Sequence, residues 1–167
     1  MKRSRLLIVL LAPVILAAGR PDVRPTAGAE DLLKVEAGIS PKRLVRGQEG
    51  KVILKVRLKK GIAISALPAF TIEVEGGEDL VFPKNFFTGS DLALVRVEIG
   101  EKDCLDLQAP IVIPFTVGPK ARRGVYVLHG RVKYFAFDLE GGVCLKSSTK
   151  FSTAYSTWAI PVRTEKP

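Results

Sequence analysis

Hydrophobic and polar residues alternate along most of this chain with a period of two. In the segment 51–58, Val52, Leu54, Val56 and Leu58 fall on one side and basic residues lie between them, which is typical of a half-buried β-strand. Such segments recur at intervals of about 8–12 residues, separated by turns rich in glycine and proline, and this spacing predicts a β-sandwich. The strands are expected over 32–39, 51–58, 62–67, 70–75, 79–82, 92–99, 110–117, 124–137 and 151–162, with 84–89 and 100–104 as connections.

The first 29 residues have a different pattern, and we expect them to be a targeting segment outside the fold. Three basic residues lie within the first five positions, and an uncharged run over 6–18 follows. That run is shorter than a membrane span of about 20 residues but suits the core of a signal peptide. Cleavage is expected after Gly19 or after Ala29, with an uncleaved anchor as the alternative. The prediction is therefore a signal peptide over 1–29 and one domain over 30–167, exported to a periplasm or the cell exterior, with no stable membrane insertion of the mature chain.

The net charge of the chain is +9, from 26 Lys and Arg against 17 Asp and Glu, a balance that can indicate nucleic-acid binding. The targeting segment holds five of these basic residues and one acid, so 21 basic and 16 acidic residues, a net charge of +5, remain for the domain. Their charges alternate with apolar residues along strands and form no cluster with aromatic residues. The sequence therefore predicts solvated strand faces and no nucleic-acid partner.

Two cysteines, Cys104 and Cys144, are the main carriers of chemistry, and an even count in an exported chain favours a pair. If 110–117 and the strand after it form a hairpin, Cys104 falls opposite residue 138, at the same end as Cys144. Three interpretations stay open: a structural disulfide that stabilises by about 3–4 kcal/mol, a redox-active pair, or thiols that never pair. His129 is the only histidine, so no metal site is expected, and no other cofactor either.

The segment 124–145 combines a long strand, a turn at 138–142 and then Cys144. Its pattern, G-x-Y-x-L-x-G-x-V-x-Y, a short loop and V-C-L, resembles the active-site hairpin of the N-terminal periplasmic domain of the thiol:disulfide interchange protein DsbD. The segment 40–64 resembles the opening of the same domain. The resemblance covers most of residues 31–163 and implies an immunoglobulin-like β-sandwich, here in a stand-alone form.

The resemblance also implies roles for particular residues. Cys144 matches the second of the family's two cysteines, whereas the first falls at about Phe137, so Cys104 is the candidate to replace it. Phe86 and Phe87 resemble the aromatic cap loop that shields the family's cysteines, and the alternative is that they plug one end of the sandwich.

The implied function is thiol:disulfide interchange, of the protein-disulfide reductase type. The implied partners are proteins, either a thioredoxin-like protein or a DsbD-type membrane electron donor. The alternative is a non-catalytic binding or assembly module with a structural disulfide. The phenylalanine at the position of a family cysteine favours this alternative, and the tyrosine strand with Cys144 favours the first.

Overall fold

A computed structural model describes residues 32–77 and 79–158. The predicted targeting segment and both cleavage sites lie outside these residues. The described part forms twelve strands, and it contains no helix that is long and apolar enough to span a membrane. The strands are β1 (Leu33–Ser40), β2 (Arg43–Val45), β3 (Glu49–Leu58), β4 (Ile62–Ser65), β5 (Thr71–Glu75), β6 (Leu80–Val81), β7 (Phe86–Thr88), β8 (Arg96–Ile99), β9 (Lys102–Leu105), β10 (Ile111–Val117), β11 (Gly124–Asp138) and β12 (Cys144–Trp158).

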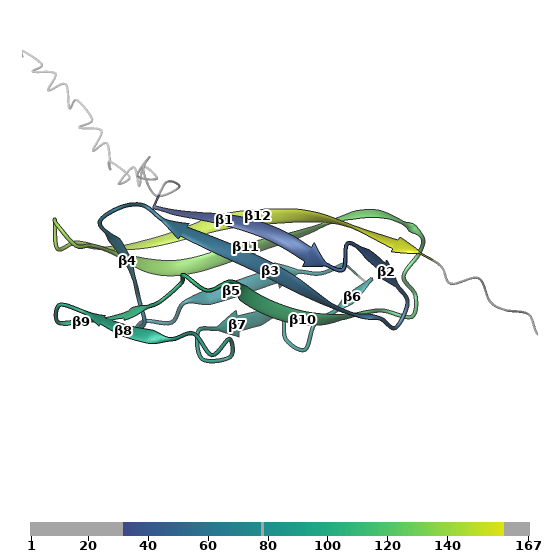
Figure 1. Ribbon diagram of the computed structural model, residues 1–167, viewed down its shortest axis with the longest axis horizontal. Coiled ribbons are helices and arrows are strands. Elements are labelled where there is room, and N and C mark those ends of the chain that lie inside the picture. Colours follow the sequence, from purple (N-terminus) through teal and green to yellow (C-terminus); the bar gives the residue numbers. More distant parts are fainter. Residues whose placement is uncertain (1–31, 78, 159–167) are drawn as a thin grey trace, which may run out of the picture.

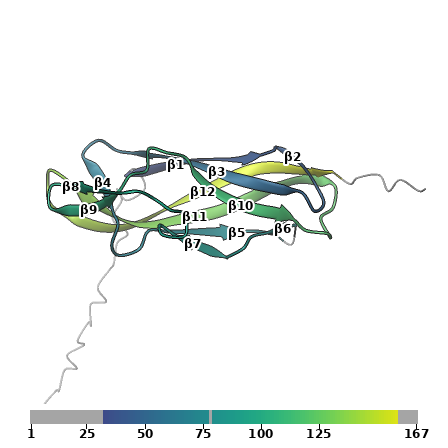
Figure 2. The same cartoon turned by 60° about the horizontal axis from the view of Figure 1, so that its bottom comes forward.

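The strands form two sheets packed face to face (Figure 1). One sheet has the order β1-β3-β10-β6 and the other the order β2-β12-β11-β4-β9-β8, with β5 and β7 added beside β11. Figure 2 shows β5 and β7 along one side of β11. In immunoglobulin constant domains the two sheets have the strand orders A-B-E-D and C-F-G. The four-stranded sheet matches the first as β1-β3-β10-β6, and the second sheet contains the second as β4-β11-β12. The predicted immunoglobulin-like β-sandwich is therefore confirmed.

The core forms where the alternating strands turn their apolar sides toward each other. On β11 the even-numbered residues from Leu128 to Ala136 are buried, and the odd-numbered residues face outward. The opposite sheet contributes Val52 and Leu54 of β3 and Ile113 of β10, each with no more than 2% of its surface exposed. This pattern is the period-two alternation that the sequence displays.

A tyrosine near the start of β11 fastens the turn that precedes it. The Tyr126 hydroxyl donates a hydrogen bond of 3.0 Å to the carbonyl oxygen of Arg122, and the Thr157 hydroxyl donates to the same oxygen. The Tyr126 ring stacks on Tyr155, with 5.5 Å between the ring centroids, and burial raises the pKa of Tyr155 to about 12. A tyrosine that bonds back to the backbone at this corner is a hallmark of the immunoglobulin fold.

The expectation that β10 and β11 form a hairpin is wrong. β10 pairs with β3 and β6, whereas β11 pairs with β12, β4 and β5. The turn over 118–123 therefore carries the chain from one sheet to the other. The predicted connections 84–89 and 100–104 contain β7 and most of β9, the strand expected over 92–99 begins only at Arg96, and the last strand begins as early as Cys144.

Two prolines protect the open edge of β10. The Val117 N–H donates to the Gln48 carbonyl on the β3 side, and the next N–H, that of Gly118, donates to the Asp79 carbonyl on the β6 side. Because backbone groups alternate in direction along a strand, Pro114 also faces the β6 side, where β6 itself reaches only Thr116. Pro110 directly precedes the strand. Neither proline has an N–H to donate, so this edge is a poor template for another strand.

Candidate functional site

The turn between β11 and β12 is held by one aspartate. Asp138 Oδ1 accepts hydrogen bonds from the backbone N–H groups of Glu140 at 3.0 Å and Gly141 at 3.1 Å. The bonds from Gly141 and Glu140 hold the pKa of the Asp138 carboxyl below its usual value. The Asp138 N–H donates to the Val143 carbonyl at 3.0 Å, and Gly142 takes a φ of 67°, which glycine adopts without strain. The hairpin that the sequence predicts is therefore present, with an ordered tip.

Cys144 follows this turn as the first residue of β12, and its side chain is exposed. Its partner across the ribbon is Phe137, the residue at which the resemblance places the other cysteine of DsbD-type domains. The Phe137 ring is half-buried, and the Lys102 ammonium lies 4.2 Å from its centroid. A cation over an aromatic face is a favourable contact, so Phe137 is a packed residue with no group that could exchange electrons with Cys144.

Cys104 lies in a different environment, within β9 between β4 and β8. Its register partners are Ser65 and Val97, and none of its surface is exposed. Burial, followed by the nearby Asp103 carboxylate, raises the pKa of the Cys104 thiol. A thiol that is buried and protonated is a poor nucleophile, so Cys104 acts as a small apolar core residue.

The two cysteines lie at the same end of the sandwich, but the sheet keeps them apart. The strand order from Cys144 to Cys104 is β12-β11-β4-β9, so two strands separate them. Three inter-strand spacings amount to about 14 Å, whereas a disulfide needs Cα atoms within about 7 Å. Both residues are free thiols, and their pairing would require β4 and β11 to leave the sheet.

The predicted cap residues do not lie over Cys144. Phe86 and Phe87 belong to β7, which joins β11 through β5. The register places Phe87 level with Val132, five residues or about 17 Å along the strand from Phe137, the partner of Cys144. Phe87 is 5% exposed and packs in the core, whereas Phe86 is 54% exposed. The arrangement favours a packing role for Phe87.

The sequence analysis missed an apolar surface around the hairpin tip. Leu139, Val143 and Leu145 on the hairpin and Ile99 at the end of β8 are each between 38% and 52% exposed. The Leu139 N–H donates to the Gly61 carbonyl at 2.9 Å, which fixes the tip against the turn between β3 and β4. We call these four side chains, with the groove described next, the apolar end. The signal for it was present as large apolar residues within a predicted turn.

A groove of about 330 Å³ adjoins these side chains. It lies between the end of β3, the start of β4 and the strands β8 and β9, and Ile99 belongs to both the groove and the exposed surface. Its apolar lining comes mainly from Val56, Leu58, Ile62, Val97, Ile99 and Leu107. In the described residues 32–77 and 79–158, no three His, Cys, Asp or Glu side chains come together in a way that could hold a metal ion.

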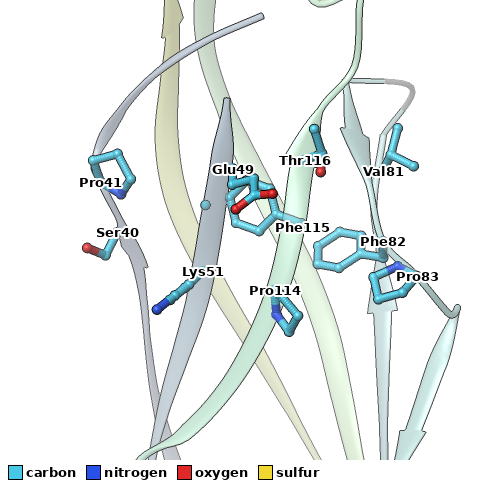
Figure 3. A pocket seen from close by; sticks show the side chains of 11 residues that line it. Ser40, Pro41, Glu49, Lys51, Val81, Phe82, Pro83, Pro114, Phe115 and Thr116 are labelled. Carbon is cyan, nitrogen blue, oxygen red and sulfur yellow. The ribbon is translucent and has the colours of Figure 1, made fainter. Parts of the chain in front are cut away.

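A second groove, of about 630 Å³, lies toward the other end of the molecule (Figure 3). Lys51 and Pro114 line its floor on the outer face of the four-stranded sheet, and Figure 3 shows Phe82 with Pro83 on one side. The Phe82 ring is tilted against the buried Phe115, with 5.6 Å between their centroids. This groove contains no cysteine or histidine.

Comparisons with known proteins give no family assignment. No protein-family model matches the chain, and no curated protein matches it in sequence. Similar solved structures include a cohesin module from a family 33 glycoside hydrolase of Clostridium perfringens, at 9% identity and a TM-score of 0.48, covering 78% of this chain and 99% of that one. Another is the N-terminal periplasmic domain of ScsB from Proteus mirabilis, at 13% identity and a TM-score of 0.43, covering 78% of this chain and 49% of that one. A third is the major pilin subunit BcpA of Bacillus cereus, at 8% identity and a TM-score of 0.40, covering 75% and 39%. None of the three reaches a TM-score of 0.5, so no function follows from them.

Proposed function

We propose that this chain is an exported, non-catalytic immunoglobulin-like module that binds a protein partner through its apolar end. The separation of Cys104 and Cys144 by two strands carries the proposal. A dithiol reductase needs two sulfurs that can approach, bond and separate again. With one thiol buried in β9 and the other exposed on the hairpin, the domain has no such centre of its own.

The apolar end has the properties of an interface. Three of its exposed side chains lie on the hairpin and the fourth, Ile99, also lines the groove. Clustered apolar surface on a soluble domain commonly marks a binding site. The tip is also ordered by the Asp138 hydrogen bonds and the Leu139–Gly61 hydrogen bond. Because the hairpin is already ordered, binding there costs this chain less conformational entropy than binding through a loose loop would.

Photo-cross-linking in the cells that export the protein tests this proposal. A benzophenone amino acid in place of Val143 or Leu139 should give a discrete adduct with one protein. The same residue in place of Val81 or Val112, which are 55% and 45% exposed on the other sheet, should give none. The change Leu145→Asp should abolish the adduct without lowering the yield of folded protein. Adducts of equal yield at all four positions, or none at the hairpin, would contradict the assignment.

A second candidate function is thiol exchange by Cys144 alone, and the exposure of this thiol on the family-like hairpin favours it. In that reaction the Cys144 thiolate attacks a disulfide of a partner protein and displaces one partner thiolate. A second thiol, from a thioredoxin-like protein or a DsbD-type membrane electron donor, then attacks the mixed disulfide and releases Cys144. Cys104 takes no part in this scheme.

Thiol trapping separates a dithiol centre from a single reactive thiol. In glutathione buffers of graded potential, we expect Cys144 to form a mixed disulfide with glutathione. Cys104 should be labelled only after unfolding, because it is fully buried. An internal Cys104–Cys144 disulfide with a potential between about −120 and −270 mV would overturn the non-catalytic proposal, since that is the range of known exchange proteins.

A further inference from the structure

The outer face of the β11–β12 ribbon carries basic side chains in the half nearer the hairpin, and two arginines lie at its other end. On this face the odd-numbered residues of β11 and the even-numbered residues of β12 point away from the core. Together with β2 and the turn before β11, they bring together Arg43, Arg123, Arg131, Lys133, Lys146 and Lys150. The acids beside them are Glu73 and Glu75 on β5, and Glu73 is bound by Lys133. We call this surface the ribbon face.

Two of its cations oppose each other directly. Arg131 and Lys150 are register partners in the antiparallel ribbon, and like charges in this position destabilise a sheet. On its other side Arg131 faces Glu73 of β5, but that carboxylate is bound by Lys133. No ion pair within the described residues involves Arg131 or Lys150. An arrangement that costs stability in the free protein becomes favourable when an anionic partner neutralises both charges.

The same face has an apolar area at one end. Trp158 is 41% exposed and lies between two guanidinium groups, with Arg123 at 4.6 Å and Arg43 at 5.6 Å from its ring centroid. Beside it on β11, Val125 is 79% exposed and Val127 is 54% exposed. Trp158 is the only tryptophan of the chain. The sequence predicted no cluster of basic and aromatic residues. The fold creates one by bringing together Arg43 of β2, Arg123 of the turn before β11, and Trp158 of β12.

We propose that the ribbon face docks on a lipid bilayer that contains anionic phospholipids. The arginines and lysines bind the headgroup phosphates, and Trp158 with the two valines enters the boundary between headgroups and acyl chains. A second copy of the chain is a poor occupant, because it would place like charges against like. A nucleic acid offers phosphates but no apolar phase for the valines.

The cations of the ribbon face also fit a lipid bilayer, whose headgroups can move, better than a partner with fixed charges. Their charges are of one sign along two long strands, and lipid headgroups can move to meet each of them. This docking goes beyond the proposed function and uses a different surface, because the apolar end lies at the hairpin whereas Trp158 lies at the opposite end of β12. A protein that fails to bind a partner through the apolar end can therefore still be tested for bilayer binding through the ribbon face.

Vesicle binding by the chain, purified in the form that cells export, tests the proposal. The probes are vesicles of phosphatidylcholine alone and vesicles with about 30% phosphatidylglycerol, at about 0.15 M salt. We expect binding to the anionic vesicles only, weakening as salt rises, with a shift of the Trp158 emission to shorter wavelength. Absence of binding, or binding without a change in Trp158 emission, would overturn the proposal.

Charge reversal gives a matched pair of variants. Lys150→Glu should weaken vesicle binding by about fivefold or more without lowering the melting temperature, because it places a carboxylate opposite Arg131 across the ribbon. The control is Lys34→Glu, since Lys34 opposes Arg57 on the outer face of the other sheet. It changes the net charge equally and should alter binding by less than about twofold. Equal losses in both variants, or tighter binding to duplex DNA than to vesicles at the same salt, would overturn the proposal.

Discussion

Replacing Gly130 by alanine should lower the free energy of unfolding by about 3 kcal/mol, a large part of the roughly 5–15 kcal/mol by which a typical domain is stable. Gly130 lies in the middle of β11, between Phe151 on β12 and Val74 on β5. A Cβ atom there would approach Phe151 Cζ to 2.3 Å and the Glu73 carbonyl oxygen to 2.8 Å. The ring has little room to move in the core, and the carbonyl belongs to a paired strand. Urea denaturation followed by tryptophan fluorescence measures the loss.

Gly38→Ala is the matched control for this change. Gly38 also lies within a strand, β1, but a Cβ atom added there meets no other atom within 4 Å. We expect stability to stay the same or rise by up to about 1 kcal/mol, since alanine restricts the unfolded chain more than glycine does. Similar losses at both positions would mean that strand propensity, and not the close approach of Phe151, decides the effect.

Truncating Phe115 to alanine should lower the free energy of unfolding by about 3–5 kcal/mol, the usual cost of emptying a buried aromatic site. Phe115 is 2% exposed, packs against the tilted ring of Phe82, and lies over the backbone of Gly50. It therefore holds β10, β3 and the segment after β6 together. The same urea denaturation measures the change, and far-ultraviolet circular dichroism shows whether the sheets persist.

A double-mutant cycle with Gly50 shows whether that contact is the cause. In the native background Gly50→Ala should cost about 1–3 kcal/mol, because its Cβ atom would lie 2.4 Å from Phe115 Cζ. In the Phe115→Ala background the same change should cost little, because the ring that blocks it has gone. The coupling energy should therefore exceed about 1 kcal/mol. Additive losses would show that Gly50 and Phe115 act independently.

The strands that the sequence predicted well are those whose alternation is long and regular. β1, β3, β10 and the β11–β12 hairpin follow from it, because each turns one side toward the core. β7 and β9 were missed, since each has only three or four residues and depends on its pairing with β5, β4 or β8. Because β9 was missed, the burial of Cys104 was missed too. In the sequence Cys104 ends the polar stretch Glu-Lys-Asp-Cys, which is typical of a loop.

The candidate site was predictable only in part, for a similar reason. The turn with Asp138 and the exposed Cys144 could be placed by local sequence alone. The distance between the cysteines could not, because neighbours in sequence usually pair in a sheet and β10 and β11 do not. The ribbon face was also invisible, since its cations come from separate segments and each segment by itself reads as an ordinary solvated strand.

The prolines beside β10 limit how many copies of the protein can join edge to edge through the four-stranded sheet. A sheet with two accepting edges can add copies at both sides and grow into a fibre, as amyloid does. With Pro110 and Pro114 closing the β10 side, the four-stranded sheet can recruit another strand only at β1. Two molecules joined there leave no accepting edge on that sheet, so the addition ends with a pair. Edge-to-edge association of the four-stranded sheet therefore terminates itself after one addition.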